Sequence, residues 1–183
     1  DSLYHVHQRN LLALEDVYVF VKTGSLFSAK KEVKRVTLAN GRFDLFTLEN
    51  GYTNGYLLKG KGEEVKDKKE QPNMYDINMI ALENVQFDIT QKPKNKAIQF
   101  RINKLKGLLY SEGKIVTITT DIDAQIDQLG FNLKKGAFLK DTRLRTKGIH
   151  IVFDNEKNGL VIDEHELKLN DTKVIFGAHF SFD

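Results

Sequence analysis

The stretch that decides the fold is Val116-Thr-Ile-Thr-Thr-Asp-Ile-Asp-Ala-Gln-Ile-Asp127, in which mainly apolar and polar residues alternate. Successive side chains of an extended chain point to opposite faces, so the even-numbered positions from Val116 to Ile126 form one apolar face. The odd-numbered positions, which include Asp121 and Asp123, form an acidic face. The stretch therefore predicts a β-strand with one apolar side and one hydrated side.

The same alternation recurs along the chain. It is clear at 98–102 and 174–182, and shorter versions occur at 43–45, 87–89 and 149–153. Sequences typical of tight turns separate these runs. They are Ala39-Asn40-Gly41, Glu49-Asn50-Gly51, Ser111-Glu112-Gly113, Leu129-Gly130 and Asn158-Gly159. We predict an all-β fold, or nearly so: an antiparallel meander of about ten short strands that forms a twisted, partly open groove or barrel-like sheet with an apolar concave face.

A degenerate repeat underlies part of this pattern, and it reads apolar-x-Leu-x-Asn/Asp-x-x-apolar-x-apolar. The four copies begin at Leu12, Val36, Ile80 and Leu167, at separations of 24, 44 and 87 residues. The extra residue after the central Asn or Asp shifts the parity of the alternation. A β-bulge or sharp bend at that residue would keep both halves of the copy on one face of a sheet.

Length and composition indicate one globular β-domain over residues 1–183. The chain carries 28 basic and 25 acidic residues, and 40% of it is hydrophobic. It begins with Asp1, and the alternation continues to its last residues, so we expect a fragment of a longer chain. Residues 60–73 are almost entirely polar, and we expect them to form a mobile charged loop.

No motif for catalysis or cofactor binding is present, so we predict a protein that is not an enzyme and has no cofactor or metal. There is no cysteine and no Gly-x-Ser-x-Gly element. Gly62 stands where a phosphate-binding loop needs Ser or Thr, and Ile126 stands where a calcium loop over Asp121, Asp123 and Asp127 needs Gly.

One basic stripe runs from Lys134 to Lys147. Within it, Arg143, Arg145 and Lys147 share a face if the segment is a strand. Such a strip suits phosphate or lipid headgroups, although a charged edge strand that discourages aggregation would have the same sequence. Basic and acidic residues are otherwise interspersed, and we predict no nucleic-acid binding.

Because no amphipathic helix is available to cover the apolar faces of the strands, three arrangements stay open. The sheet could close into a barrel, pack as a sandwich, or leave a lined groove for an apolar ligand.

The stretch Val36-Thr-Leu-Ala-Asn-Gly-Arg-Phe-Asp-Leu-Phe46, followed by Gly51-Tyr-Thr-Asn54, resembles the AsmA-like family of Gram-negative bacteria. Ile80-Ala-Leu-Glu-Asn-Val-Gln-Phe-Asp-Ile89 resembles the next element of that family, and Gly136-Ala-Phe-Leu-Lys-Asp-Thr-Arg-Leu144 resembles its Bacteroidetes versions. The resemblance implies a periplasmic protein, held in the inner membrane by an N-terminal anchor missing from this chain, that supports outer-membrane biogenesis by carrying phospholipid. It offers no catalytic residues to transfer.

The resemblance and the alternation together predict a non-enzymatic β-groove that shields phospholipid acyl chains. The predicted acyl contacts are Val116, Ile118, Ile122, Ile126, Phe176, Phe180 and Phe182, and the predicted headgroup contacts are Arg143, Arg145 and Lys147. The alternative is a closed β-sandwich or barrel that serves as an interaction or assembly module and has no lipid ligand.

Overall fold

The computed structural model describes residues 9–27, 31–58, 75–154 and 156–181. The segment predicted to be a mobile charged loop, 60–73, and the predicted acyl contact Phe182 lie outside these ranges.

Strands make up most of the described chain. They are β1 (Leu12–Val21), β2 (Lys31–Thr47), β3 (Tyr75–Ile77), β4 (Met79–Gln91), β5 (Lys96–Glu112), β6 (Ile115–Gly130), β7 (Leu139–Asp154), β8 (Gly159–Leu169) and β9 (Thr172–Ser181). Four short 3-10 turns accompany them: η1 (Thr23–Phe27), η2 (Asn54–Leu58), η3 (Lys92–Lys94) and η4 (Leu133–Lys135). No α-helix occurs within the described ranges, so the prediction of an all-β chain is confirmed.

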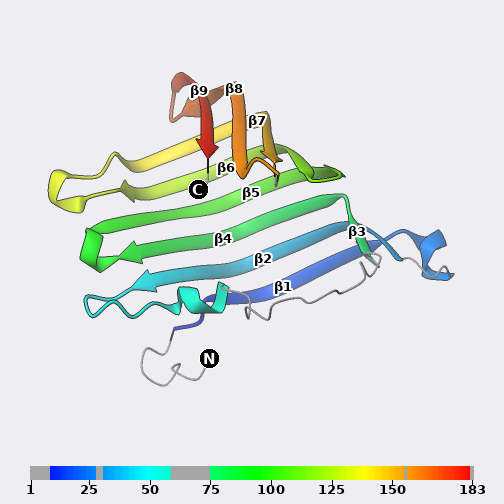
Figure 1. Cartoon of the computed structure of the whole chain (residues 1–183), viewed down its shortest axis with the longest axis horizontal. Coiled ribbons are helices and arrows are strands. Elements are labelled where there is room, and N and C mark those ends of the chain that lie inside the picture. The colour runs from blue at the N-terminus through cyan, green and yellow to red at the C-terminus, as the bar shows by residue number, and fades with distance from the viewer. Residues whose placement is uncertain (1–8, 28–30, 59–74, 155, 182–183) are drawn as a thin grey trace.

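All of these strands belong to one sheet, in the order β1-β2-β4-β5-β6-β7-β8-β9, with β3 paired to the start of β2 (Figure 1). The sheet is mostly antiparallel, as predicted, but β2 pairs in parallel with both β3 and β4. Parallel neighbours require the chain to cross back to its starting end, and the long connection from Thr47 to Met79 makes that crossing. The other neighbours in the row are antiparallel.

The expected number of strands is wrong, because eight long strands form the row instead of about ten short ones. They are 10 to 17 residues long, well above the roughly 5–6 residues of an average strand. Runs such as 36–38 and 43–45, which the sequence separates by Asn40-Gly41, join into the single strand β2. The prediction of a turn at Asn40-Gly41 is therefore wrong.

Asn40 and Asn84 are left-handed bend residues inside their strands, and neither shifts the register with the neighbouring strands. Both have left-handed backbone conformations, with φ of 51° and 52°, and the β2–β4 register steps past them from Ala39↔Glu83 to Gly41↔Val85. Asn84 donates a hydrogen bond to Asn40 at 3.0 Å, and Asn40 donates one to Asp16 at 2.8 Å. The parity of the alternation changes at each bend, so the apolar residues before and after it lie on one face. The predicted bend is therefore confirmed at these two copies of the repeat.

The fourth copy behaves differently, because its central residues form a hairpin turn between β8 and β9. Leu169 pairs with Thr172, and Asn170 adopts a φ of 52°. A two-residue turn with a left-handed Asn reverses the chain, whereas an isolated left-handed residue within a ladder only bends it. The prediction of a bulge or bend within one strand is wrong there.

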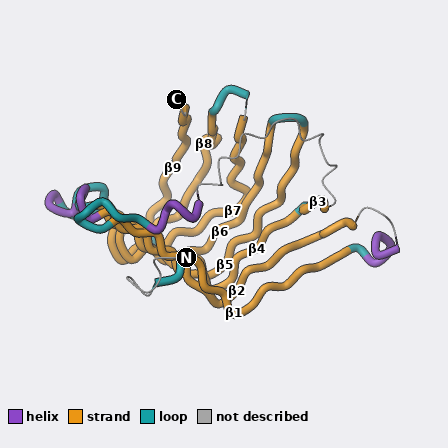
Figure 2. Tube along the Cα trace, turned by 60° about the horizontal axis from the view of Figure 1, so that its bottom comes forward, coloured by secondary structure: helices purple, strands orange, loops and turns teal. Residues whose placement is uncertain are grey.

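The sheet is open (Figure 2). The row ends at β1 on one side and at β9 on the other, and these two edges do not pair within the described ranges. The alternative of a closed barrel or sandwich is therefore wrong for the described chain. Buried apolar side chains occur from β2 to β7 and include Phe46, Val85, Ile102, Ala124 and Ile149.

Candidate functional site

One face of the sheet is apolar from edge to edge, and the strand register defines it. One row of paired residues across this face is Val17, Leu38, Leu82, Leu105 and Ile122. A second row is Leu12, Phe43, Phe87, Phe100 and Ile126, and two further rows are Leu109, Ile118, Ile151, Ile162, Ala178 and Val116, Phe153, Leu160, Phe180. We call this surface the apolar face.

The structure brings the predicted acyl contacts together on the apolar face. Val116, Ile118, Ile122 and Ile126 follow one another along β6, where no bulge interrupts their alternation. Phe176 and Phe180 alternate in the same way along β9, and Phe180 pairs with Leu160 of β8. All six described candidates therefore share one side of the sheet.

The sequence interpretation missed an aromatic row at the centre of the apolar face. The ring centroids of Phe43 and Phe87 are 5.7 Å apart, and those of Phe87 and Phe100 are stacked at 4.9 Å. The repeat held the signal, because Phe43 and Phe87 occupy the same position of their copies. These two copies lie side by side in register because β2 and β4 are parallel.

Polar residues on the apolar face satisfy their own hydrogen bonds. Thr142 donates to the carbonyl of Lys140 at 2.9 Å, and Thr146 donates to the carbonyl of Glu166 at 3.3 Å. Each hydroxyl is therefore used by a backbone carbonyl. These two threonines therefore present mainly their methyl groups, and not an unpaired hydroxyl, to a ligand on the apolar face.

The apolar face has no second layer over it within the described ranges, because every described strand belongs to the same sheet. The side chains of the central strands are buried or half-buried by one another. Towards the edges they are open to solvent: Val17 is 56% exposed, Phe176 40% and Phe180 47%. Large exposed apolar surfaces are typical of interaction sites, so the apolar face is the candidate site of this chain.

The opposite face is charged. A cleft of about 620 Å³ lies where β7 and β8 separate, and its lining includes Ile122 and Thr146 of the apolar face as well as charged residues of the opposite face. The β7–β8 ladder lacks paired residues between Arg145↔Lys168 and Ile151↔Ile162. A row of charged residues crosses four strands there, with Asp123 between Lys104 and Arg145 and with Lys168 beside Arg145.

The predicted headgroup contacts divide between two environments on this charged face. Arg145 and Lys147 line the cleft, whereas Arg143 holds Asp123 in a bidentate ion pair with the closest contact at 2.7 Å. All three belong to the side of the sheet away from the predicted acyl contacts, or to the bulge at Gly148 beside it. One lipid lying across the apolar face would therefore not reach Arg143 or Arg145 with its headgroup.

The acidic residues of β6 accept hydrogen bonds from residues of β4, β5 and β7. The hydrogen bond from Arg143, aided by Asn103 and by the charges of Arg143 and Arg145, holds the pKa of Asp123 below its usual range. Asp121 accepts a hydrogen bond from the backbone of Gly148 at 2.8 Å, and Asp127 accepts one from Gln86 at 3.2 Å. These carboxylates stabilise the sheet.

Neither a metal site nor a membrane-spanning helix occurs among the described residues. No group of three or more His, Asp or Glu side chains in these ranges is placed to hold a metal ion. None of the described helical segments has the length and hydropathy required to span a bilayer.

The fold and the site define an open, single-layered β-sheet protein with one apolar and one charged face. No known protein-family model, no curated protein and no solved structure matches the chain. Its function must therefore be argued from the two faces themselves.

Proposed function

We propose that this chain is a non-enzymatic module that shields phospholipid acyl chains on its apolar face. The single observation that supports the proposal is the continuity of that face across eight strands without a covering layer among the described residues. Withdrawing an acyl chain from water is worth roughly 0.8 kcal/mol per CH₂, so an apolar surface suffices for binding and no chemical step is needed.

The dimensions of the sheet suit this ligand. β5 has 17 residues, which span roughly 55 Å at about 3.3 Å per residue. One leaflet of a bilayer has a hydrocarbon depth of only about 15 Å, half of the whole core. An acyl chain could therefore lie along the strands with room at both ends.

The cellular setting is part of the same proposal. The resemblance of Val36–Phe46 and Ile80–Ile89 to AsmA-like elements supports a periplasmic protein, with an inner-membrane anchor in its parent chain, that aids outer-membrane biogenesis. The bends at Asn40 and Asn84 give these stretches a common structural role, because both keep the two halves of their strand on one face.

Mass spectrometry of an organic extract of the gently purified protein tests the proposal. Stoichiometric phospholipid is the expected result. The variant Ile118→Asp/Ile122→Asp should lose it, because two carboxylates would have to be desolvated beneath the acyl chain. Thr119→Asp/Gln125→Asp is the matched control, since both positions lie on the charged face of the same strand.

Circular dichroism shows whether each variant remains folded. If Ile118→Asp/Ile122→Asp unfolds, the milder Phe176→Ser/Phe180→Ser takes its place, because both side chains are already partly exposed on edge strand β9. Unchanged lipid content in a folded apolar-face variant, or the absence of lipid from the native protein, would contradict the proposal.

A further inference from the structure

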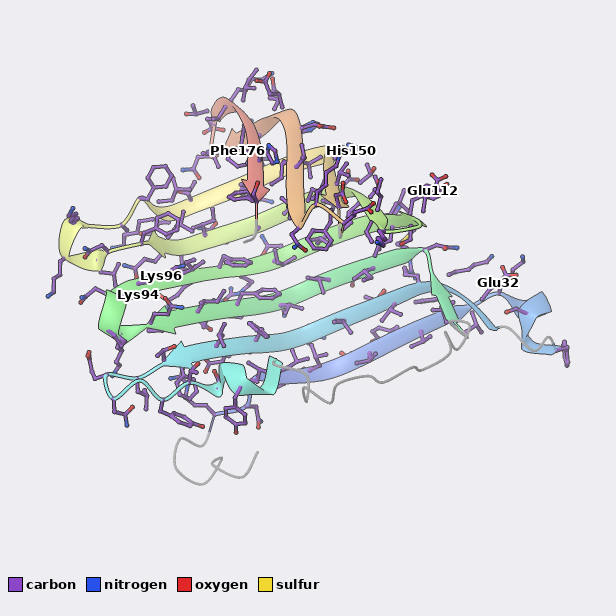
Figure 3. All side chains as sticks on the ribbon, viewed as in Figure 1. Glu32, Lys94, Lys96, Glu112, His150 and Phe176 are labelled. Atoms are coloured by element: carbon purple, nitrogen blue, oxygen red, sulfur yellow. The ribbon has the colours of Figure 1, made fainter. Side chains whose placement is uncertain are left out.

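Two turns meet at one end of the sheet, and together they form what we call the basic tip: residues 92–96, between β4 and β5, and residues 131–138, between β6 and β7. The backbone N–H of Leu133 donates a hydrogen bond to the carbonyl of Asn95 at 2.7 Å, so the turns are joined. Figure 3 shows Lys94 and Lys96 at this end of the sheet and Glu112 at the other end.

Large apolar side chains project from the basic tip. Phe131 is 60% exposed and Phe138 is 74% exposed, and Leu133 is also open to solvent. The ammonium group of Lys96 lies 5.6 Å from the centroid of the Phe131 ring, so cationic and aromatic groups share one surface. More than half of the surface of each of these two aromatic side chains is therefore free to contact another molecule.

The charge of the basic tip has one sign. Its two turns contain Lys92, Lys94, Lys96, Lys134 and Lys135 and no acidic residue. None of these lysines takes part in an ion pair with another described residue. Glu49, in the turn after β2, lies at the same end of the sheet but on the far side of β4.

We propose that the basic tip docks on the surface of an anionic lipid bilayer. Lysines gain electrostatic attraction from anionic headgroups, and aromatic side chains are most stable at the boundary between headgroups and acyl chains. The tip offers both groups on two joined turns. Docking does not depend on the function proposed above, because the tip would bind a bilayer whether or not the apolar face holds lipid.

The apolar face reaches the basic tip. Its last row before the turns is Ile89, Ile98, Leu129 and Leu139, which pair across β4, β5, β6 and β7. Docking at this end would therefore bring the apolar face to the bilayer surface end-on. Neither the charged cleft nor the β5–β6 turn at Glu112 would make contact in that orientation.

Co-sedimentation of the purified chain with vesicles of phosphatidylglycerol and phosphatidylcholine, in roughly a 1:3 ratio, tests the proposal. Vesicles of phosphatidylcholine alone provide the neutral comparison. We expect binding to the anionic vesicles that weakens sharply in about 0.5 M salt, because exposed charges are screened. Lys94→Gln/Lys134→Gln/Lys135→Gln should lower the affinity about a hundredfold, at roughly fivefold for each lysine.

Phe131→Ser/Phe138→Ser should weaken binding at least tenfold and leave the salt dependence in place. Phe27→Ser is the matched aromatic control, because Phe27 is 93% exposed but lies in η1 at the opposite end of the sheet. Lys22→Gln/Lys34→Gln/Lys114→Gln is the charge control at that same end, and both controls should bind like the native chain. The proposal would be overturned if the tip variants and the control variants lost the same affinity for anionic vesicles, or if the native chain did not prefer anionic to neutral vesicles.

Discussion

Asn54 is the residue whose replacement should most clearly affect stability. Its side chain is fully buried at 0% exposure beside the end of β2, which β1 no longer covers there. The Oδ1 atom accepts a hydrogen bond from the N–H of Phe46 at 2.9 Å, and the Nδ2 atom donates one to the carbonyl of Asp44 at 2.6 Å. The side-chain amide of Asn54 thus supplies the hydrogen-bond donor and acceptor that the backbone of a neighbouring strand would otherwise provide to β2.

Asn54→Ala removes both hydrogen bonds and leaves one donor and one acceptor buried. Each unsatisfied group costs about 1–3 kcal/mol, so the free energy of unfolding should fall by about 2–6 kcal/mol. The loss should be nearer the lower end if the segment from Tyr52 to Gly55 moves and admits water.

Urea denaturation at neutral pH, followed by circular dichroism, measures this loss. Asn50→Ala is the control in the same loop, because Asn50 is exposed and makes only one hydrogen bond, from the N–H of Tyr52 at 3.1 Å. The control should change stability by less than about 1 kcal/mol. If Asn54→Ala lost no more stability than Asn50→Ala, the two hydrogen bonds of Asn54 to β2 would not be important for stability, and the reasoning would be refuted.

Asn54→Asp adds a pH test of the same contact. The charged carboxylate keeps an acceptor for Phe46 but faces the carbonyl of Asp44, so the folded state favours the protonated form and raises the pKa of the introduced carboxyl. The variant should be nearest to native stability below the unfolded pKa of about 3.9 and lose stability as the pH rises through the folded pKa. A stability difference from the native chain that stays constant with pH would contradict this reasoning.

Two further predictions concern the charged face and the bends. Because the folded state lowers the pKa of Asp123, its ion pair with Arg143 stabilises the protein above the unfolded pKa, and this contribution is lost as the pH falls through the folded pKa. Asp123→Asn should therefore be less stable than the native chain at neutral pH, and this difference in stability should shrink in acid. Thermal unfolding at several pH values measures the difference. A difference that grows in acid would contradict the prediction. Asn84→Ala should lower stability by about 1–2 kcal/mol because alanine strains at the φ of 52°. Asn84→Gly should cost less in the same denaturation assay, and equal losses would assign the effect to the hydrogen bond with Asn40 instead.

The alternation could be predicted from the sequence because it depends on one strand at a time. Val116 to Ile126 follow the period of a β-strand, and their shared face follows from that period alone. The bends at Asn40 and Asn84 could be predicted for a related reason. Without a change of parity, half of the apolar side chains of each strand would face the solvent on the other side of the sheet. Asn tolerates the left-handed backbone conformation that this change requires.

Other features depend on where distant segments meet, and no local pattern determines that. The parallel pairing of β2 with β4 follows from the path of the chain after Thr47. The charged cleft combines Lys104, Asp123, Arg145 and Lys168 from four strands, and only the register shows that they are neighbours. The same local pattern also had two outcomes: Asn40 bends a strand, whereas Asp171, at the same position of its copy, lies in the two-residue turn between β8 and β9.

The division of the sheet into two faces connects both proposals. On the charged face, the hydrogen bonds of Asp121, Asp123 and Asp127 tie β6 to β7 and to β4. Stability is therefore supplied without a second layer, which leaves the apolar face available for a ligand. A protein that closed this face with its own core would gain burial but have no surface to offer an acyl chain. Because the basic tip lies where the apolar face ends, a docked sheet would receive acyl chains from the bilayer with little exposure to water, and each CH₂ kept from water avoids a cost of roughly 0.8 kcal/mol.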